Sequence, residues 1–216
     1  MLEQVRRHPS ALLLIVQLLG IVLYPFVEST RAGAPTLAVF GMVVLYVTIR
    51  MVRRTPWLTW ISVGLAIPTT LLLVLQAMAD RPQLIVWSSA LEAMFYFYAT
   101  GSLIAYMLAD RYATLDELFA VGATFTLLAW AFTHLFVVVQ ALQPGSFQAA
   151  VNPQQARSWS ELMYLSFALL SSTGIGDVIP VTVHARAVAS LAMFAGVMYL
   201  AMVVSRLIGL TLQPRS

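Results

Sequence analysis

The sequence contains no cysteine and no lysine, and it has few charged residues of any kind. The absence of cysteine excludes disulfides and thiolate metal sites. Only 10% of the 216 residues are charged and 60% are hydrophobic, whereas a soluble domain of this length carries about 25% charged residues. The excess of apolar side chains has to face something other than water. The composition therefore indicates an integral membrane protein surrounded by a lipid bilayer.

The basic residues carry two further indications. All twelve of them are arginine, which we interpret as the codon composition of a GC-rich bacterial genome. The net charge of +3 is small, and the arginines cluster at the ends of apolar segments, where membrane topology explains them. The charge pattern therefore indicates no nucleic-acid partner.

Six apolar segments are long enough to cross a bilayer, which takes about 20 residues for a helix. They cover residues 10–28, 35–52, 57–79, 83–109, 115–142 and 184–212. Charged and turn-forming residues separate them, for example Asp80, Arg81 and Pro82. The sequence therefore predicts an all-α integral membrane fold with six transmembrane helices.

The arginines also predict the orientation, because cytoplasmic loops carry an excess of positive charge. On one side lie Arg6, Arg7, Arg50, Arg53, Arg54, Arg111, Arg206 and Arg215, and on the other lie Arg31, Arg81, Arg157 and Arg186. This bias places both termini in the cytoplasm of a multi-pass protein of the cell membrane, which we take to be a bacterial inner membrane. The first segment also has features of a secretory signal, but its apolar core exceeds the usual length of about 7–15 residues.

A stretch of different character, residues 158–180, lies between the fifth and sixth segments. Ser158 and Glu161 have the spacing of a capping box, and the helix that follows, to about Leu170, is too short to cross a bilayer. Next comes Ser171-Ser-Thr-Gly-Ile-Gly-Asp177, whose glycines can adopt backbone angles closed to other residues. A short helix and a glycine-rich strand between two apolar helices are the parts of a cation-channel pore, where carbonyl oxygens replace the water around an ion.

Such a segment restricts how the chain can assemble. The short helix would end in mid-membrane with the negative end of its dipole inward, and four such ends around an axis would stabilise a cation. Non-helical backbone at that depth is tolerated only where it is buried in protein or lines water. Residues 172–177 therefore cannot face lipid, and because one chain supplies one such segment, a closed ring needs several chains.

Residues 158–212 resemble the pore domain of the tetrameric potassium-channel superfamily, whose filter is written Thr-Val-Gly-Tyr-Gly-Asp. The corresponding residues here are Ser172, Thr173, Gly174, Ile175, Gly176 and Asp177. Pro180-Val-Thr182 and Arg186 match the family's outer linker, and Gly196 lies where the inner helix of the family often keeps a hinge glycine. The whole chain is similar to six-span members, with residues 1–112 as a peripheral four-helix domain and residues 113–216 as the pore domain.

The resemblance implies a homotetramer that conducts monovalent cations, with potassium as the favoured ion. It implies no enzymatic activity and no cofactor beyond the conducted ions. Potassium sites would be lined by the carbonyls of Ser172, Thr173, Gly174 and Ile175, and the outer mouth would be formed by Gly176 and Asp177. Gly196 would let the inner helix bend, and Val197, Leu200 and Val204 would face the cavity below it.

Two filter positions depart from the family pattern, since Thr173 stands for valine and Ile175 for tyrosine. The tyrosine anchors the filter through its hydroxyl, which isoleucine lacks, so we expect apolar neighbours such as Leu165 and Phe167 to hold Ile175 by packing. We therefore expect a filter that is less rigid than the filter of the family. A non-selective or sodium-permeable channel on the same fold is therefore an alternative.

The peripheral domain occupies the place of a voltage sensor but lacks its residues. Voltage sensing needs several arginines along one span, and the fourth span contains neither arginine nor lysine. We therefore expect no conventional voltage sensor. Glu92, the acid predicted deepest in a lipid-spanning helix, is a candidate functional residue or a hydrogen-bonded packing residue, and His134 is expected to be a satisfied interior histidine.

Asp116 and Glu117, after Thr114, are predicted to cap the cytoplasmic start of the fifth helix. A peripheral domain would pull on the pore at this junction, so a coupling role is open for both acids.

The sequence leaves the gating stimulus open. The possibilities are lipid, membrane tension, pH acting through Glu92 or His184, and constitutive opening.

Three other functions stay open: a membrane enzyme, a transporter and a non-conducting auxiliary subunit. An enzyme needs clustered acids and histidines at depth, whereas Glu92 and His134 lie on different spans with no motif joining them. Transporters tend to have broken helices in both halves, and the sequence shows one reentrant segment.

Overall fold

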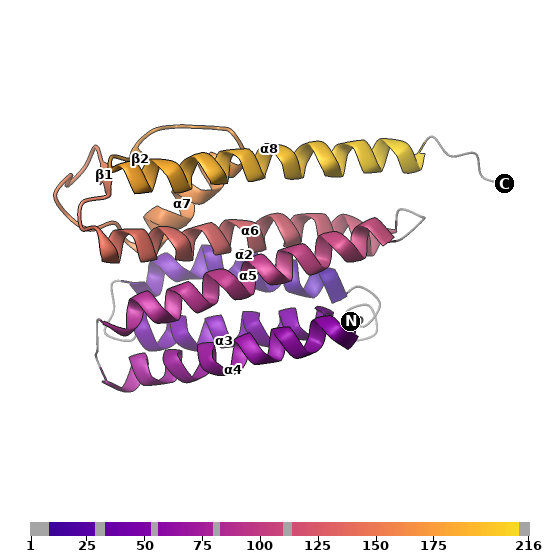
Figure 1. The fold of residues 1–216 in the computed structure, drawn as a ribbon, viewed down its shortest axis with the longest axis horizontal. Coiled ribbons are helices and arrows are strands. Elements are labelled where there is room, and N and C mark those ends of the chain that lie inside the picture. The colour runs from indigo at the N-terminus through magenta and orange to yellow at the C-terminus, as the bar shows by residue number, and fades with distance from the viewer. Residues whose placement is uncertain (1–8, 29–32, 53–55, 80–82, 110–113, 212–216) are drawn as a thin grey trace.

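The computed structural model describes residues 9–28, 33–52, 56–79, 83–109 and 114–211. These residues form seven helices and a two-stranded ribbon (Figure 1). The helices are α2 (Pro9–Glu28), α3 (Gly33–Val52), α4 (Pro56–Ala79), α5 (Leu84–Ala109), α6 (Leu115–Leu142), α7 (Trp159–Leu170) and α8 (Val183–Thr211), and the strands are β1 (Phe147–Ala149) and β2 (Val178–Pro180). The predicted helical class is confirmed, but the ribbon was not predicted, because strands of three residues are too short to show an alternating pattern.

Helices occupy all six of the predicted apolar segments. Three of the described helices can cross a membrane by length and composition, over Pro9–Phe26, Leu115–Leu142 and Val183–Arg206. The helices α3, α4 and α5 are 20, 24 and 26 residues long, but they do not meet the same criterion within the described residues. Six crossings therefore stay a prediction. The predicted domain boundary, between residues 112 and 113, lies outside the described residues.

Helix α6 is the centre of the molecule. It packs against α2 and α5 on one side and against α7 and α8 on the other, so that α8 lies at one edge of Figure 1 and α3 and α4 at the opposite edge. Its middle is buried on every side, with Trp130 and Phe136 among the largest fully buried side chains. A helix that is apolar all round is expected in such an interior position.

The ribbon joins the two loops that flank α7. Strands β1 and β2 are antiparallel, with Phe147 opposite Pro180 and Ala149 opposite Val178. Phe147 is buried and its ring lies edge-on to Phe136 of α6, with centroids 5.3 Å apart. The segment that follows residue 177 is therefore tied, through β1, to the end of α6.

Candidate selectivity filter

The short helix α7 begins as the sequence predicts. The Ser158 hydroxyl accepts the Glu161 N–H at 3.3 Å, and the Glu161 carboxylate accepts the Ser158 N–H at 2.8 Å, so the predicted capping box is confirmed. Twelve residues extend over about 18 Å, less than the hydrocarbon core of about 30 Å. The buried Ser166 hydroxyl donates to the Ala129 carbonyl of α6 at 2.8 Å, which fixes the helix against its neighbour.

Residues 172–177, between α7 and β2, form an extended segment without β-pairing that we call the filter strand. Its residues alternate between two backbone conformations. Ser172, Gly174 and Gly176 have φ angles of 58°, 57° and 81°, whereas the intervening Thr173 and Ile175 have no positive φ. This alternation allows successive carbonyls to turn to the same side of the strand. The left-handed Ser172 was not predicted, because such a conformation costs an L-residue about 1–2 kcal/mol.

The N–H groups at the base of this strand are used by the end of α7. Thr173 and Gly174 both donate to the Ala168 carbonyl, at 3.0 and 3.2 Å, and Ser172 donates to the Leu169 carbonyl at 3.1 Å. The Thr173 hydroxyl lies 2.7 Å from that of Ser171. The backbone N–H groups therefore hold the inner end of the strand against α7, and its carbonyl oxygens take no part in these bonds.

Residues 171–177 are all exposed on the described chain. Ile175 leaves 62% of its surface uncovered, while Leu165 is buried in the core and the Phe167 ring lies beside Phe125. The packing expected from Leu165 and Phe167 therefore does not enclose Ile175 within one chain. At the outer end, the Asp177 carboxylate accepts the N–H of Val178 at 3.0 Å.

Helix α8 passes directly behind the end of α7. It is continuous through Gly196, and a Cβ at this position would overlap the backbone of Leu170, including its carbonyl oxygen. Val197, Leu200 and Val204 lie on the uncovered face of α8, with 52%, 41% and 52% of their surfaces exposed. Close packing against Leu170 therefore explains why position 196 is a glycine. Its role as a hinge stays a prediction.

Comparison with known families gives one match. A family model described as "Ion channel" matches residues 93–213, which include most of α5 and the whole of α6, α7 and the following strand. The chain belongs to the ion-channel family. The predicted membership of the pore-loop cation-channel superfamily is therefore confirmed. No curated protein and no solved structure matches the chain.

The channel also contains a buried pair that the sequence left separate. His134 Nδ1 of α6 lies 3.2 Å from Glu92 Oε2 of α5, and their side chains are 5% and 7% exposed. Residue 113 lies in the connection between α5 and α6, and both Glu92 and His134 are 21 positions away from it in the sequence. Neighbouring helices joined by a short connection run antiparallel, so equal distances from the connection could have predicted this contact.

This pair lies directly behind the start of α7. The His134 ring stacks on Tyr96 at 5.6 Å and lies edge-on to Trp159 at 6.2 Å. Trp159 is the first residue of α7 and also packs against Trp130 of α6, at 5.2 Å. The aromatic cluster thus joins the Glu92–His134 pair to the short helix of the channel.

We expect His134→Leu to destabilise the channel, because it leaves the buried Glu92 carboxyl without the polar group that lies 3.2 Å from it. Leaving a buried polar group without a partner costs about 1–3 kcal/mol, whereas replacing both partners by apolar groups of the same shape can be nearly neutral or stabilising. Thermal unfolding in detergent should show a lower transition temperature for H134L, and the added substitution Glu92→Leu should recover most of the loss. An unchanged transition temperature for H134L would show that the pair contributes nothing.

The opposite end of the channel has a second set of polar contacts. Thr114 caps α6 in a capping box with Glu117, as predicted. Glu117 also pairs with Arg206 of α8 at 2.8 Å, and Asp116 accepts from the backbone and hydroxyl of Ser10 at 3.1 and 2.8 Å. The start of α6 is thereby bonded to the start of α2 and to the end of α8, while a coupling role for the two acids stays a prediction.

Proposed function

We propose that the protein is a homotetrameric channel in which potassium passes through a filter lined by the carbonyls of Ser172, Thr173, Gly174 and Ile175. The observation that carries this proposal is the exposed strand 172–177, with its alternating left-handed residues, at the end of a short helix. Exposed non-helical backbone cannot face lipid. In a member of an ion-channel family, we expect this backbone to be shielded from lipid by further copies of the same strand, arranged around a water-filled axis.

The chemistry of the strand supports cation binding. Because the N–H groups of residues 172–174 donate to α7, the carbonyl oxygens are the groups of this backbone that remain to meet an ion. A ring of such oxygens replaces the hydration shell of potassium. The carboxyl end of α7 adds its partial negative charge, and the Ser172 hydroxyl would line the innermost site.

The same proposal assigns the other helices. Six helices cross the membrane, α7 enters from the outside without crossing, and both termini are cytoplasmic. Helices α2 to α5 form the peripheral domain and act without gating arginines. On α8, Val197, Leu200 and Val204 line the cavity, and Gly196 allows the helix to bend.

Passive flux through purified protein tests this function. Vesicles that contain the protein and potassium chloride should lose potassium down its gradient when a protonophore lets protons enter to balance the charge, with no second substrate, and protein-free vesicles treated in the same way should not. Folded protein that passes no ions would contradict the proposal and favour an auxiliary subunit. Saturable exchange that requires another solute would favour a transporter.

A non-selective or sodium-permeable channel is the second candidate, and the exposed Ile175 favours it. If a missing hydroxyl anchor weakens selectivity, Thr173→Val with Ile175→Tyr should raise the permeability of potassium over sodium. One hydrogen bond contributes about 0.5–1.5 kcal/mol, so the expected gain is up to about tenfold. Reversal potentials with potassium on one side and sodium on the other measure it, and an unchanged ratio would contradict this explanation.

A further inference from the structure

We propose that Arg157 is a positioning residue for the filter: it folds the outer loop, residues 150–157, into a clamp that holds the outer end of the strand 172–177. This inference rests on the proposed function, because it assigns the support of the same filter. It goes beyond that function by locating the support in the loop between β1 and α7, which contributes no group to the ion pathway itself.

The strand is fixed at both ends, by different parts of the chain. Its inner end donates to the Ala168 carbonyl of α7. At its outer end, the carbonyl of Asp177 accepts the N–H of Ala150 at 3.2 Å, next to the β1–β2 pair of Ala149 and Val178. The position of Asp177 therefore depends on where the loop holds Ala150.

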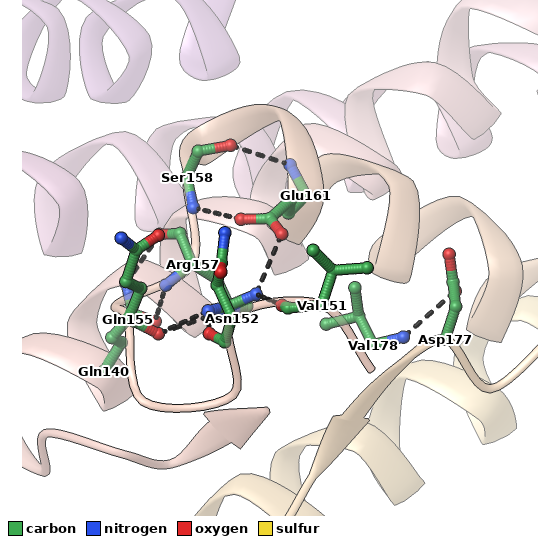
Figure 2. A network of polar contacts seen from close by, with 9 residues as sticks. All are labelled: Gln140, Val151, Asn152, Gln155, Arg157, Ser158, Glu161, Asp177 and Val178. Atoms are coloured by element: carbon green, nitrogen blue, oxygen red, sulfur yellow. Dashed lines mark hydrogen bonds and ion pairs between the residues drawn. The ribbon is translucent and has the colours of Figure 1, made fainter. Parts of the chain in front are cut away.

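Arg157 determines the shape of this loop (Figure 2). Its side chain is 2% exposed, and its guanidinium donates to three backbone carbonyls of the loop and to one carboxylate oxygen. The carbonyls belong to Val151 at 3.3 Å, Asn152 at 2.6 Å and Gln155 at 2.6 Å, and the oxygen belongs to Glu161 at 3.0 Å. The Arg157 side chain thus bonds three residues of the loop to one another and to the first turn of α7.

The backbone of the same residue is held by α6. The Gln140 amide donates to the Arg157 carbonyl at 2.9 Å, and the Arg157 N–H donates to the Gln140 oxygen at 2.8 Å. Phe147, at the start of β1, is also packed on α6. The loop is therefore fixed to α6 at both of its ends, and Arg157 fills the space between them.

An arginine is required for this role. A buried cation is costly unless its donors are satisfied, and the planar guanidinium offers five donors in a fixed fork, whereas the lysine ammonium offers three on a flexible stem. An arginine that served only as a topology signal would lie in water or among headgroups. The three carbonyls that surround the guanidinium indicate instead that Arg157 stabilises the loop next to the filter.

The test compares Arg157→Gln and Arg157→Lys with Arg186→Gln in the full-length assembly. Arg186 is an exposed arginine on the same predicted side, and its guanidinium donates to the Pro180 carbonyl at 3.2 Å, outside the loop. Hydrogen exchange of the amide of Ala150 and of residues 174–178 reports the clamp directly. Reversal potentials with potassium and sodium report its effect on the filter.

We expect both Arg157 variants to exchange these amide hydrogens at least tenfold faster and to lose at least threefold in potassium over sodium permeability, with the middle of α6 unchanged. R186Q should change neither by more than twofold. Equal effects of R157Q and R186Q, or unchanged exchange in the folded R157K, would overturn the inference. If the unmodified protein did not conduct, the proposed function would fail while the exchange experiment still decided the clamp.

Discussion

Potassium conduction is expected to be lost when Gly174 or Gly176 is replaced by alanine. Their φ angles of 57° and 81° lie in the left-handed region, which costs an L-residue about 1–2 kcal/mol. Four copies around one axis would accumulate about 4–8 kcal/mol of strain in the filter. Nothing lies within 4 Å of a Cβ built on Gly174, and a Cβ on Gly176 meets only the Gly174 carbonyl oxygen at 3.9 Å. The effect on one chain is therefore backbone strain and not a clash.

Gly145→Ala is the matched control for this prediction. Gly145 has a φ of 83° and open space around it, and it lies in the loop after α6, outside residues 172–177. Its substitution should cost a similar free energy in each chain and leave conduction intact. Potassium flux into vesicles, normalised to the amount of folded assembly, measures all three variants. Undiminished flux through G174A would contradict the assignment of the filter.

A loss of stability is expected for Gly196→Ala. The new Cβ would overlap the backbone of Leu170, so α8 or the end of α7 must move, and both elements support the filter. Overpacking of this kind costs about 1–3 kcal/mol, against a gain of about 1 kcal/mol in helix propensity. Because a carbonyl oxygen is the obstacle, no rotation of a side chain can relieve it. We therefore expect a net loss in each copy, together with reduced conduction.

Gly101→Ala supplies the comparison, since Gly101 lies in α5 with nothing within 4 Å of a built Cβ. It should gain stability from helix propensity alone. Thermal unfolding of the detergent-solubilised assembly separates two roles for Gly196. A hinge predicts that G196A is as stable as G101A but opens differently, whereas close packing predicts that G196A unfolds at a lower temperature. Equal stability of the two variants would contradict the packing role.

Features that depend on neighbouring residues in the sequence could be predicted. Helices begin and end within about two residues of the predicted segments, because long apolar runs and the caps at Thr114 and Ser158 are local signals. The short helix and the glycine-bearing strand were predicted for the same reason. The family match to residues 93–213 agrees with the motif that identified them.

Features that depend on distant contacts could not be predicted in the same way. Glu92 and His134 are 42 residues apart, and only the pairing of α5 with α6 brings them together. The arginine count assigned Arg157 to a loop on the outer side, but a count of charges cannot show that a guanidinium is enclosed by carbonyls. The close approach of Gly196 to Leu170 likewise depends on how α8 crosses the end of α7.

The central claim is that four copies of residues 172–175 surround one axis and offer their carbonyl oxygens to potassium. Electron cryomicroscopy of the purified assembly in potassium chloride tests it most directly. We predict four chains related by a fourfold axis, with ion density on that axis between successive rings of these carbonyls. A different number of chains around this strand, or a strand turned toward the detergent or lipid, would contradict the account.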